Sequence, residues 1–477
     1  MIMHFLPEFV LAAMTLIFFF LSLGTRSVDT LRGIALTGAL LAVIASVLAF
    51  DASGVFFFNA YSVEPFSQTA KTVLTLGFFF VLAMSPGLLG VKERLNAEYY
   101  FFLFLSTFGL VMLSSAAEFL TLVLCLEISS FSVYVIIPFR RKGKGYRAQI
   151  EAALKYMLFG ALATGITLYG ISYVYGITQT TYLNELASAV PGLIGEKPLL
   201  TVGFALILCG IFFKLALFPM HFWAPDVYQG GANETTTFVA TIPKVGATLL
   251  LIRLAVLIGQ PPAVLTAIIS ILAVLSMSVG NLSALVQDDV KRLLAYSSIA
   301  HAGYLMVGVA TGSLGGFSGA LYYIVAYLFL NVACFYVIYH LAPLGNNIGF
   351  SDIRGLYRRS PVLAATLAVG AIGLAGIPPT AGFMGKLLVF LAAVDKGMVP
   401  LVIFAVINAG ISAYFYLKLI RAAYTGEPET AQPVHLAAFS KSLGPVLILI
   451  ILGIGIFPKW LMAIFDLAVT HAVPLYS

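Results

Sequence analysis

Charged side chains are scarce in this sequence. They make up 10% of its 477 residues, whereas soluble proteins carry about 25%. Hydrophobic residues reach 61%, and polar linkers, low-complexity runs and charged tails are lacking. Because each crossing of a bilayer needs about 20 mainly apolar residues, we expect an all-α, polytopic membrane protein in which residues 1–477 form a single domain.

Motifs for cofactor chemistry are absent as well. The three cysteines, Cys125, Cys209 and Cys334, lie in apolar runs without CxxC spacing, which argues against disulfides and zinc sites. There is no Walker motif, no GxGxxG opening a βαβ unit and no HExxH. We therefore expect the chain to bind no cofactor or metal, and to move ions without performing redox chemistry or hydrolysis itself.

Basic residues are in excess and give a net charge of +6. The densest cluster lies in one short loop between two apolar runs and comprises Arg140, Arg141, Lys142, Lys144 and Arg147. Short basic loops are typical of the cytoplasmic side of membrane proteins, so the charge does not indicate nucleic acid. Residues 1–23 lack the features of a signal peptide. These patterns predict a multi-pass protein of a bacterial inner membrane, with both termini on the periplasmic side.

Hydropathy predicts fourteen membrane helices. They are expected near residues 4–23, 30–50, 66–88, 97–115, 118–138, 149–175, 199–229, 233–258, 262–282, 290–311, 316–341, 361–394, 398–424 and 443–464. The seventh and twelfth are longer than one crossing requires, and they contain Pro219 and the pair Pro378 and Pro379. Since proline removes a backbone donor and clashes with the preceding turn, we expect both helices to be broken.

The two breaks lie five spans apart, which suggests an internal duplication. After three N-terminal helices in residues 1–96, two five-helix repeats would occupy residues 97–258 and 262–424, and the last helix would be 443–464. Because five is an odd number, the second repeat would be inverted relative to the first. Paired broken helices in inverted repeats point to the ion pathway of a transporter.

Five ionisable side chains lie deep within apolar spans: Glu127, Lys155, Lys214, Lys244 and Lys386. A charge at the centre of a membrane helix costs about 2.5–3.5 kcal/mol, so stability gives no reason to keep them. Ion pairing between helices is one explanation, but a single glutamate cannot neutralise four lysines. Since burial disfavours the charged form of an amine, these lysines are candidates for groups that take up and release protons, and a row of them is typical of a proton relay.

Neighbouring residues refine this set. Lys214 and Lys386 lie close to the expected breaks, where unpaired carbonyls and water can stabilise an ammonium group. Serines next to Glu127 either hold water or complete a hydrogen-bond path, or they bond back to their own helix. His301 is either a satisfied core group or a member of the relay. Lys71 either belongs to the same list of buried ionisable residues or, because it lies closer to a helix end, reaches the interface, and we favour the interface.

Several stretches together resemble one known family. They are LCLEISSFSVY, ALKYMLFGA, FKLALFPMHFWAPDVYQG, ATIPKVGA, LVQDDVKRLLAYSSIAHAGY and GIPPTAGFMGK, spread between residues 98 and 424. These stretches are similar to the antiporter-like subunits of respiratory complex I, the proton-pumping NADH:quinone oxidoreductase, and most of all to subunit N. One departure is GANETTTF, which replaces the proline-rich turn of the family; we interpret its Glu234 as a loop surface charge rather than an entrance group.

The resemblance implies a fourteen-helix fold with two inverted five-helix repeats and broken helices seven and twelve. It also implies a proton path made of Glu127, Lys155, Lys214, Lys244 and Lys386, to which His301 is added as a candidate. The implied partners are other membrane subunits of complex I, which would carry NADH, FMN, iron–sulfur clusters and quinone, besides the lipid bilayer and protons. Redox chemistry in those partners would change the charge at Glu127, then at Lys214 and at the lysines beyond it.

Three other functions stay open on the residues alone. A subunit of a multisubunit cation/proton antiporter or of a membrane-bound hydrogenase would share the same helices and lysines. A structural spacer would hold its buried charges in ion pairs. A stand-alone solute transporter is disfavoured because no candidate substrate site is evident beyond the charged axis.

Overall fold

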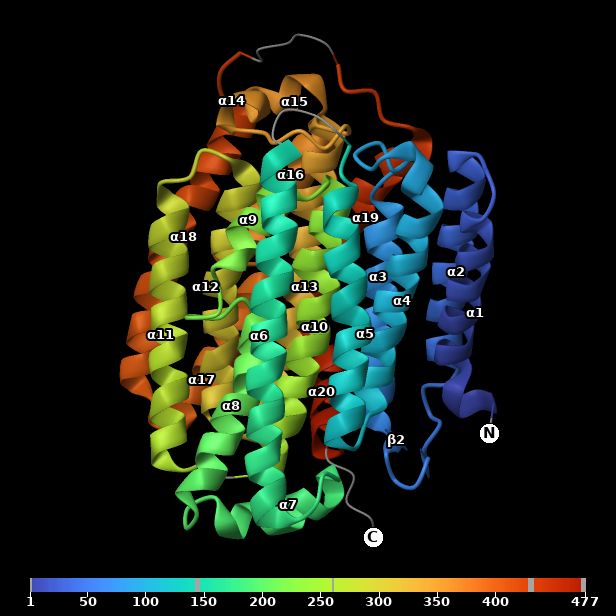
Figure 1. Ribbon diagram of the computed structural model, residues 1–477. Helices are drawn as coiled ribbons and strands as arrows, with labels where there is room; N and C mark the ends of the chain where they lie inside the picture. The colour runs from blue at the N-terminus through green and yellow to red at the C-terminus, as the bar shows by residue number, and fades with distance from the viewer. Residues whose placement is uncertain (1, 142–145, 260, 428–432, 473–477) are drawn as a thin grey trace.

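A computed structural model describes residues 2–141, 146–259, 261–427 and 433–472. The chain forms one bundle of long, roughly parallel helices (Figure 1). Within the described residues, thirteen helices are long and apolar enough to cross a membrane, and the remaining predicted span is present as two shorter helices. The prediction of an all-α polytopic membrane fold is confirmed. Of the basic loop, Lys142 and Lys144 lie outside the described residues.

The first six crossings follow the predicted spans to within a few residues. They are α1 (Leu6–Ser22), α2 (Val28–Leu48), α3 (Pro65–Ala83), α4 (Asn96–Ser115), α5 (Phe119–Ile136) and α6 (Tyr146–Thr178). Between α2 and α3 the chain makes a short antiparallel hairpin of β1 (Gly54–Phe56) and β2 (Tyr61–Val63), which hydropathy did not reveal. Between α6 and the seventh crossing, α7 (Leu183–Leu193) lies at the end of the bundle (Figure 1).

The seventh and twelfth crossings are broken, as the prolines predicted. The seventh consists of α8 (Pro198–Leu215) and α9 (Trp223–Gly230), and Pro219 lies in the segment that joins them. The twelfth consists of α16 (Pro361–Ala375) and α17 (Ala381–Asp395), joined through Pro378 and Pro379. At each break the residue after the first half-helix adopts a left-handed conformation, with φ of 59° at Ala216 and 82° at Gly376.

The other crossings of the second half are continuous except the last. They are α10 (Asn233–Ile258), α11 (Ala263–Leu285), α12 (Val290–Ala310), α13 (Leu314–Leu341) and α18 (Val399–Tyr424), with the short α14 (Phe350–Ile353) and α15 (Leu356–Arg359) between α13 and α16. The single helix expected over 443–464 is instead α19 (Ala438–Ile456) followed by α20 (Pro458–Thr470). Pro458 explains the difference, because a proline ring clashes with the carbonyl group of the preceding helical turn and so interrupts the helix.

Burial is greatest in α10, α12 and α13, which lie in the middle of the bundle (Figure 1). Their sequences are apolar around most of their circumference, as expected of helices that other helices surround. The start of α1 and the end of α20 lie at the same end of the bundle (Figure 1). The inverted relation of the two five-helix repeats stays a prediction.

Candidate functional site

Glu127 and Lys214 face one small cavity between α5, α6 and α8. The cavity measures about 20 Å³ and is also lined by Tyr134, Gly160 and Thr164. The Thr164 hydroxyl donates a hydrogen bond to Glu127 Oε1 at 2.6 Å. A space of this size between polar groups is enough for a water molecule, so the glutamate and the lysine can exchange a proton through water.

Lys214 is buried at the end of the first half of the broken seventh helix. Its Nζ donates to Ser130 Oγ at 2.5 Å and lies 5.6 Å and 5.7 Å from the ring centres of Tyr134 and Tyr156. Ser130 also donates back to the Leu126 carbonyl, which is the bond to its own helix expected for the serines beside Glu127. Aromatic faces stabilise the ammonium form without a carboxylate.

Lys244, on α10, lies just beyond the break in the seventh helix. Its Nζ donates to the carbonyl oxygen of Leu215 at 3.1 Å and to Ser298 Oγ at 2.9 Å. Leu215 ends α8, and its carbonyl is one of those that a helix end leaves without an intrahelical partner. The carbonyl that accepts from Lys244 thus belongs to the residue that follows Lys214 in the chain.

His301 continues the row on α12. A cavity of about 10 Å³ joins it to Lys244 and is also lined by Ser298, Tyr323 and Tyr327. The imidazole bonds Tyr323 through Nδ1 at 2.6 Å and Tyr416 through Nε2 at 3.1 Å. Both ring nitrogens are thus occupied by phenols, an arrangement in which a proton can arrive at one nitrogen and leave from the other.

Lys386, on α17, ends the row beside the second break. Its Nζ donates to the carbonyl oxygens of Leu374 at 3.2 Å and Ala375 at 2.9 Å, in the last turn of α16. It also lies 4.6 Å from the ring centre of Tyr304, one turn along α12 from His301. As at the first break, carbonyl groups freed by the interruption accept from a buried lysine, which explains why the breaks and the lysines occur together.

Lys155 is placed differently from the other predicted residues. Its side chain is 40% exposed on α6, and its Nζ is 2.7 Å from Asp226 and 2.5 Å from Glu151. Asp226 in turn bonds Arg292 at 3.1 Å. Sequence position alone put Lys155 deep in a span, but the rotation of α6 turns it toward the bundle surface.

Two expectations about single residues were wrong. Lys71 does not reach the interface: its side chain is wholly buried, and its Nζ lies 2.7 Å from Glu8 Oε1, which also accepts from the Tyr61 hydroxyl at 2.6 Å. Glu234 is not a loop surface charge either, because it lies in the first turn of α10 and is 3% exposed. Both side chains are covered by segments distant in the sequence.

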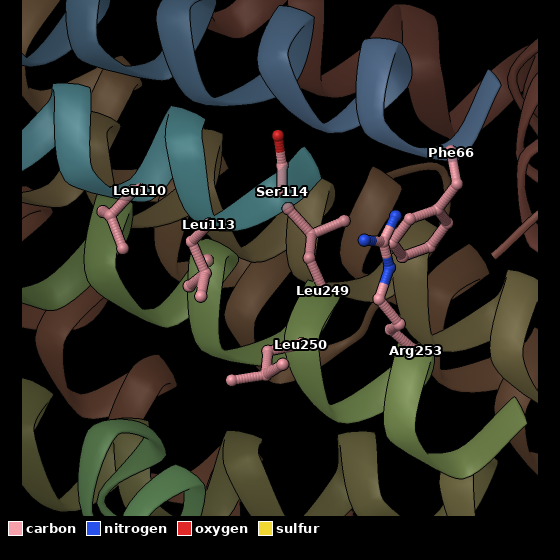
Figure 2. A pocket seen from close by; sticks show the side chains of 8 residues that line it. Phe66, Leu110, Leu113, Ser114, Leu249, Leu250 and Arg253 are labelled. Atoms are coloured by element: carbon pink, nitrogen blue, oxygen red, sulfur yellow. The ribbon is translucent and has the colours of Figure 1, made fainter. Parts of the chain in front are cut away.

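A further buried ion pair, which the sequence did not reveal, joins α10 to the residue that precedes α3. Arg253 Nη2 contacts Glu64 Oε1, and Arg253 Nη1 donates to the Ala116 carbonyl at 2.9 Å. Figure 2 shows its guanidinium against the ring of Phe66, 5.2 Å from the ring centre. Arg253 stands near the end of a predicted span, and nothing nearby in the chain pointed to its partner.

Comparison with known families agrees with this architecture. The sequence model described as NADH:quinone oxidoreductase/Mrp antiporter, transmembrane, matches residues 116–412. The chain belongs to the NADH:quinone oxidoreductase/Mrp antiporter family. All five residues of the polar row, from Glu127 to Lys386, lie within the region that the family shares.

Individual members of the family differ in how closely they match. NADH-quinone oxidoreductase subunit N 2 of Solidesulfovibrio magneticus is 43% identical over 475 residues, which cover 100% of this chain and 99% of the relative. A chain of respiratory complex I from Thermus thermophilus with bound aureothin is 31% identical, with a TM-score of 0.83 over 96% of this chain and 98% of that one. The resemblance to the antiporter-like subunits of complex I is confirmed.

The fold extends beyond complex I. A chain of the Mrp complex from Dietzia sp. DQ12-45-1b has a TM-score of 0.86 over 99% of this chain and 98% of that one, at 20% identity. At that identity the likeness shows the fold alone. The fold of the family therefore does not separate the two kinds of complex, whereas the sequence identities favour complex I.

Proposed function

We propose that this chain is a proton-translocating membrane subunit of an NADH:quinone oxidoreductase, of the subunit N type. The observation that carries the proposal is the row of buried polar groups from Glu127 through Lys214, Lys244 and His301 to Lys386, in which Glu127 and Lys214 share one water-sized cavity and Lys244 and His301 share another. Such chains of titratable groups in a membrane are typical of proton relays. Lys155, which lies outside the buried row, is proposed to belong to the same proton path.

The state of the lysines supports transport over a structural role. Within the described part of the chain, Lys214, Lys244 and Lys386 have no carboxylate within ion-pair distance, and their partners are hydroxyls, carbonyls and aromatic rings. These neutral partners do not hold the ammonium charge as a carboxylate would, so each lysine is able to release its proton. A spacer with its charges fixed in ion pairs does not fit this pattern.

In the proposed mechanism the chain moves charge, and partner subunits supply the energy. Oxidation of NADH and reduction of quinone, with FMN and iron–sulfur clusters, would take place in those subunits. A change of charge near Glu127 would alter the electrostatic field at Lys214, whose proton would pass to Lys244 and onward to His301 and Lys386. The cell inner membrane is the proposed location, with both termini on its periplasmic side.

A stand-alone solute transporter fits the cavities poorly. Those along the polar row hold about 10–20 Å³, far below the size of a solute site. A cavity of about 600 Å³ does lie between α3, α13, α19 and α20, but apart from two threonines apolar side chains line it. It offers no convergent polar groups to orient a polar substrate.

The first test is to identify the proteins that co-purify with the chain. Purified in a mild detergent, it is expected to bring with it subunits that contain flavin and iron–sulfur clusters, detected by absorbance and electron paramagnetic resonance. In liposomes this complex should take up protons when NADH and a quinone are added, as followed by a pH-sensitive dye. Proton exchange driven by a sodium or potassium gradient, without redox subunits, would instead identify a cation/proton antiporter.

Lys155 provides a graded prediction within the path. Lys155→Met is expected to slow NADH-driven proton uptake by less than about fivefold, because Lys155 is partly exposed, is held by two carboxylates and lies outside the buried row. Lys214→Met in the same assay should have a much larger effect. Equal losses from the two substitutions would show that Lys155 is as central as the buried lysines.

A further inference from the structure

Glu234 is a buried carboxylate that the proposed path does not use. It lies in the first turn of α10, and its Oε1 accepts a hydrogen bond from the backbone N–H of Gly90 at 3.1 Å. Its other oxygen, Oε2, has no hydrogen-bond partner among the described residues. A carboxylate oxygen left without a partner away from solvent costs free energy, so its presence calls for an explanation.

Two loops that contain glycine cover Glu234. Gly90 lies so close that a Cβ added to it would stand 2.8 Å from Glu234 Oε2, and Gly345 packs on Gly90 in turn. The residues next to these two glycines, Leu89 and Leu344, are 44% and 52% exposed. The carboxylate is therefore covered by two glycine-containing loops at the bundle end where α10 begins.

Two cations lie close enough to act on Glu234 by charge: Lys291, at the start of α12, and Arg140. Lys291 is fully buried, and its Nζ donates to the Gly231 carbonyl at 3.0 Å. Arg140 donates to the carbonyls of Gln229 and Gly230 at 2.8 Å and 3.1 Å. Neither cation forms an ion pair with Glu234, so the carboxylate is influenced by positive charge without being locked to it.

Polar groups lead from this end of the bundle to Lys244 along α10. Thr237, Thr241 and Lys244 stand three, seven and ten residues after Glu234, a spacing that puts all four on one helix face. Each threonine donates to a carbonyl one turn earlier, at 2.7 Å and 2.6 Å, which leaves its oxygen free to accept from water. The distance along the helix from Glu234 to Lys244 is about 15 Å.

A second polar line runs beside it. Lys291 and Ser298 stand two turns apart on one face of α12. Ser298 Oγ accepts from Lys244 Nζ at 2.9 Å and from the Tyr228 hydroxyl at 3.4 Å. One line therefore begins at Glu234 and the other at Lys291. Both end at Lys244 of the proposed path.

We propose that Glu234 is a proton-loading group, through which protons from the aqueous phase at this end of the bundle reach Lys244. This inference rests on the proposed function and adds to it the place where protons are taken up. The transfer step is balanced: Glu234 accepts one proton from water at the loop surface and passes one proton inward, so that it returns to the carboxylate.

A purely structural role of Glu234 predicts a different response to substitution. An acidic residue in the first turn of a helix interacts favourably with the helix dipole, and the bond from Gly90 fastens the neighbouring loop. Glutamine keeps the size of the side chain and the oxygen that accepts from Gly90, but it cannot take up a proton. Aspartate keeps the ability to ionise on a shorter side chain.

The test uses the whole complex reconstituted in liposomes, with NADH-driven proton uptake and NADH oxidation measured together from pH 6 to pH 9. Glu234→Gln is expected to slow proton uptake by about tenfold or more, in line with the loss of a proton-transfer group, and to change its dependence on pH. Glu234→Asp should retain most of the proton-uptake rate of the unmodified protein. Glu93→Gln, at an exposed glutamate on the same side of the bundle, serves as the matched control and should behave like the unmodified protein.

The possible outcomes separate the two proposals. Glu234→Gln with an unchanged rate and pH profile, while Lys214→Met is impaired, would overturn the loading role and leave the proposed function in place. If Lys214→Met also pumps at the normal rate, the proposed function itself fails. A Glu234→Gln complex that pumps slowly but is not rescued by Glu234→Asp, with an unchanged pH profile, would indicate a structural role and would also overturn the proposal.

Discussion

Lys214→Met is expected to slow NADH-driven proton uptake by about tenfold or more while the complex still assembles. Methionine fills nearly the same volume, and the surroundings of Lys214, with Tyr134, Tyr156 and Phe213, already suit an apolar side chain. No carboxylate is left unpaired, because Glu127 bonds Thr164 rather than the lysine. Removing the charge also removes an insertion cost of about 2.5–3.5 kcal/mol, so the loss should fall on transport and not on folding.

Two companion variants separate the charge of Lys214 from its ability to titrate. Lys214→Arg keeps a positive charge, but guanidinium does not release its proton near neutral pH, so proton uptake should be slow here as well. Lys396→Met removes an exposed lysine between α17 and α18 and should leave the rate unchanged. Size-exclusion chromatography reports assembly in each case. Normal pumping by a well-assembled Lys214→Met complex would take this residue out of the path and would overturn the proposed function.

Much of the fold follows from local sequence, for reasons that the structure makes plain. Apolar runs of about 20 residues cross the bilayer as helices because a helix satisfies its backbone hydrogen bonds within a single segment. Proline cannot continue a helix, so Pro219, Pro378 and Pro379 marked the two breaks correctly. Pro458 obeys the same rule, but its effect on the last span was missed because the hydropathy remains high on both sides of it.

The surroundings of single side chains were harder to predict. The depth of a residue within a span is set by its position along the chain, whereas its burial depends on which way that face of the helix points. In an almost uniformly apolar helix, hydropathy does not indicate which face is buried. Lys155 and Lys71 show the two errors: one expected inside is 40% exposed, and one expected near the interface is fully buried against Glu8. Glu234 depends on Gly90, which is far away in the sequence.

The same reasoning explains why the row of lysines was easier to recognise than the ion pairs. A lysine in an apolar run is unusual on its own, and several of them near helix breaks suggest a function without knowledge of any partner. An ion pair such as Arg253 with Glu64 joins residues that each stand near the end of a span, where charges are ordinary. Its meaning appears only when the fold brings the two together.

Arg253→Met is expected to lower the free energy of unfolding by about 3–5 kcal/mol, the usual cost of leaving one member of a buried ion pair without its partner. Arg253 is 1% exposed, and its loss would leave both Glu64 and the Ala116 carbonyl without their donor. The midpoint of denaturant unfolding of the solubilised protein measures the change. The double variant Glu64→Gln with Arg253→Met removes both charges and should recover most of the loss.

The dependence of this loss on pH identifies the unpaired carboxylate as its cause. Burial raises the pKa of Glu64 above its ordinary value of 4.5, and the charge of Arg253 opposes that rise. Without Arg253 the pKa of Glu64 rises further, so the folded state binds a proton that the unfolded state releases. The variant is then relatively most stable below about pH 4.5, and it loses stability as the pH rises through the raised pKa of Glu64 in the folded state.

The loss in free energy of unfolding caused by Arg253→Met should therefore shrink in acid. Arg26→Met, at an exposed position, should show no such loss at any pH. A deficit that is the same at pH 4 and pH 8 would mean that packing around the guanidinium, and not the charge of Glu64, accounts for the stability that Arg253 provides.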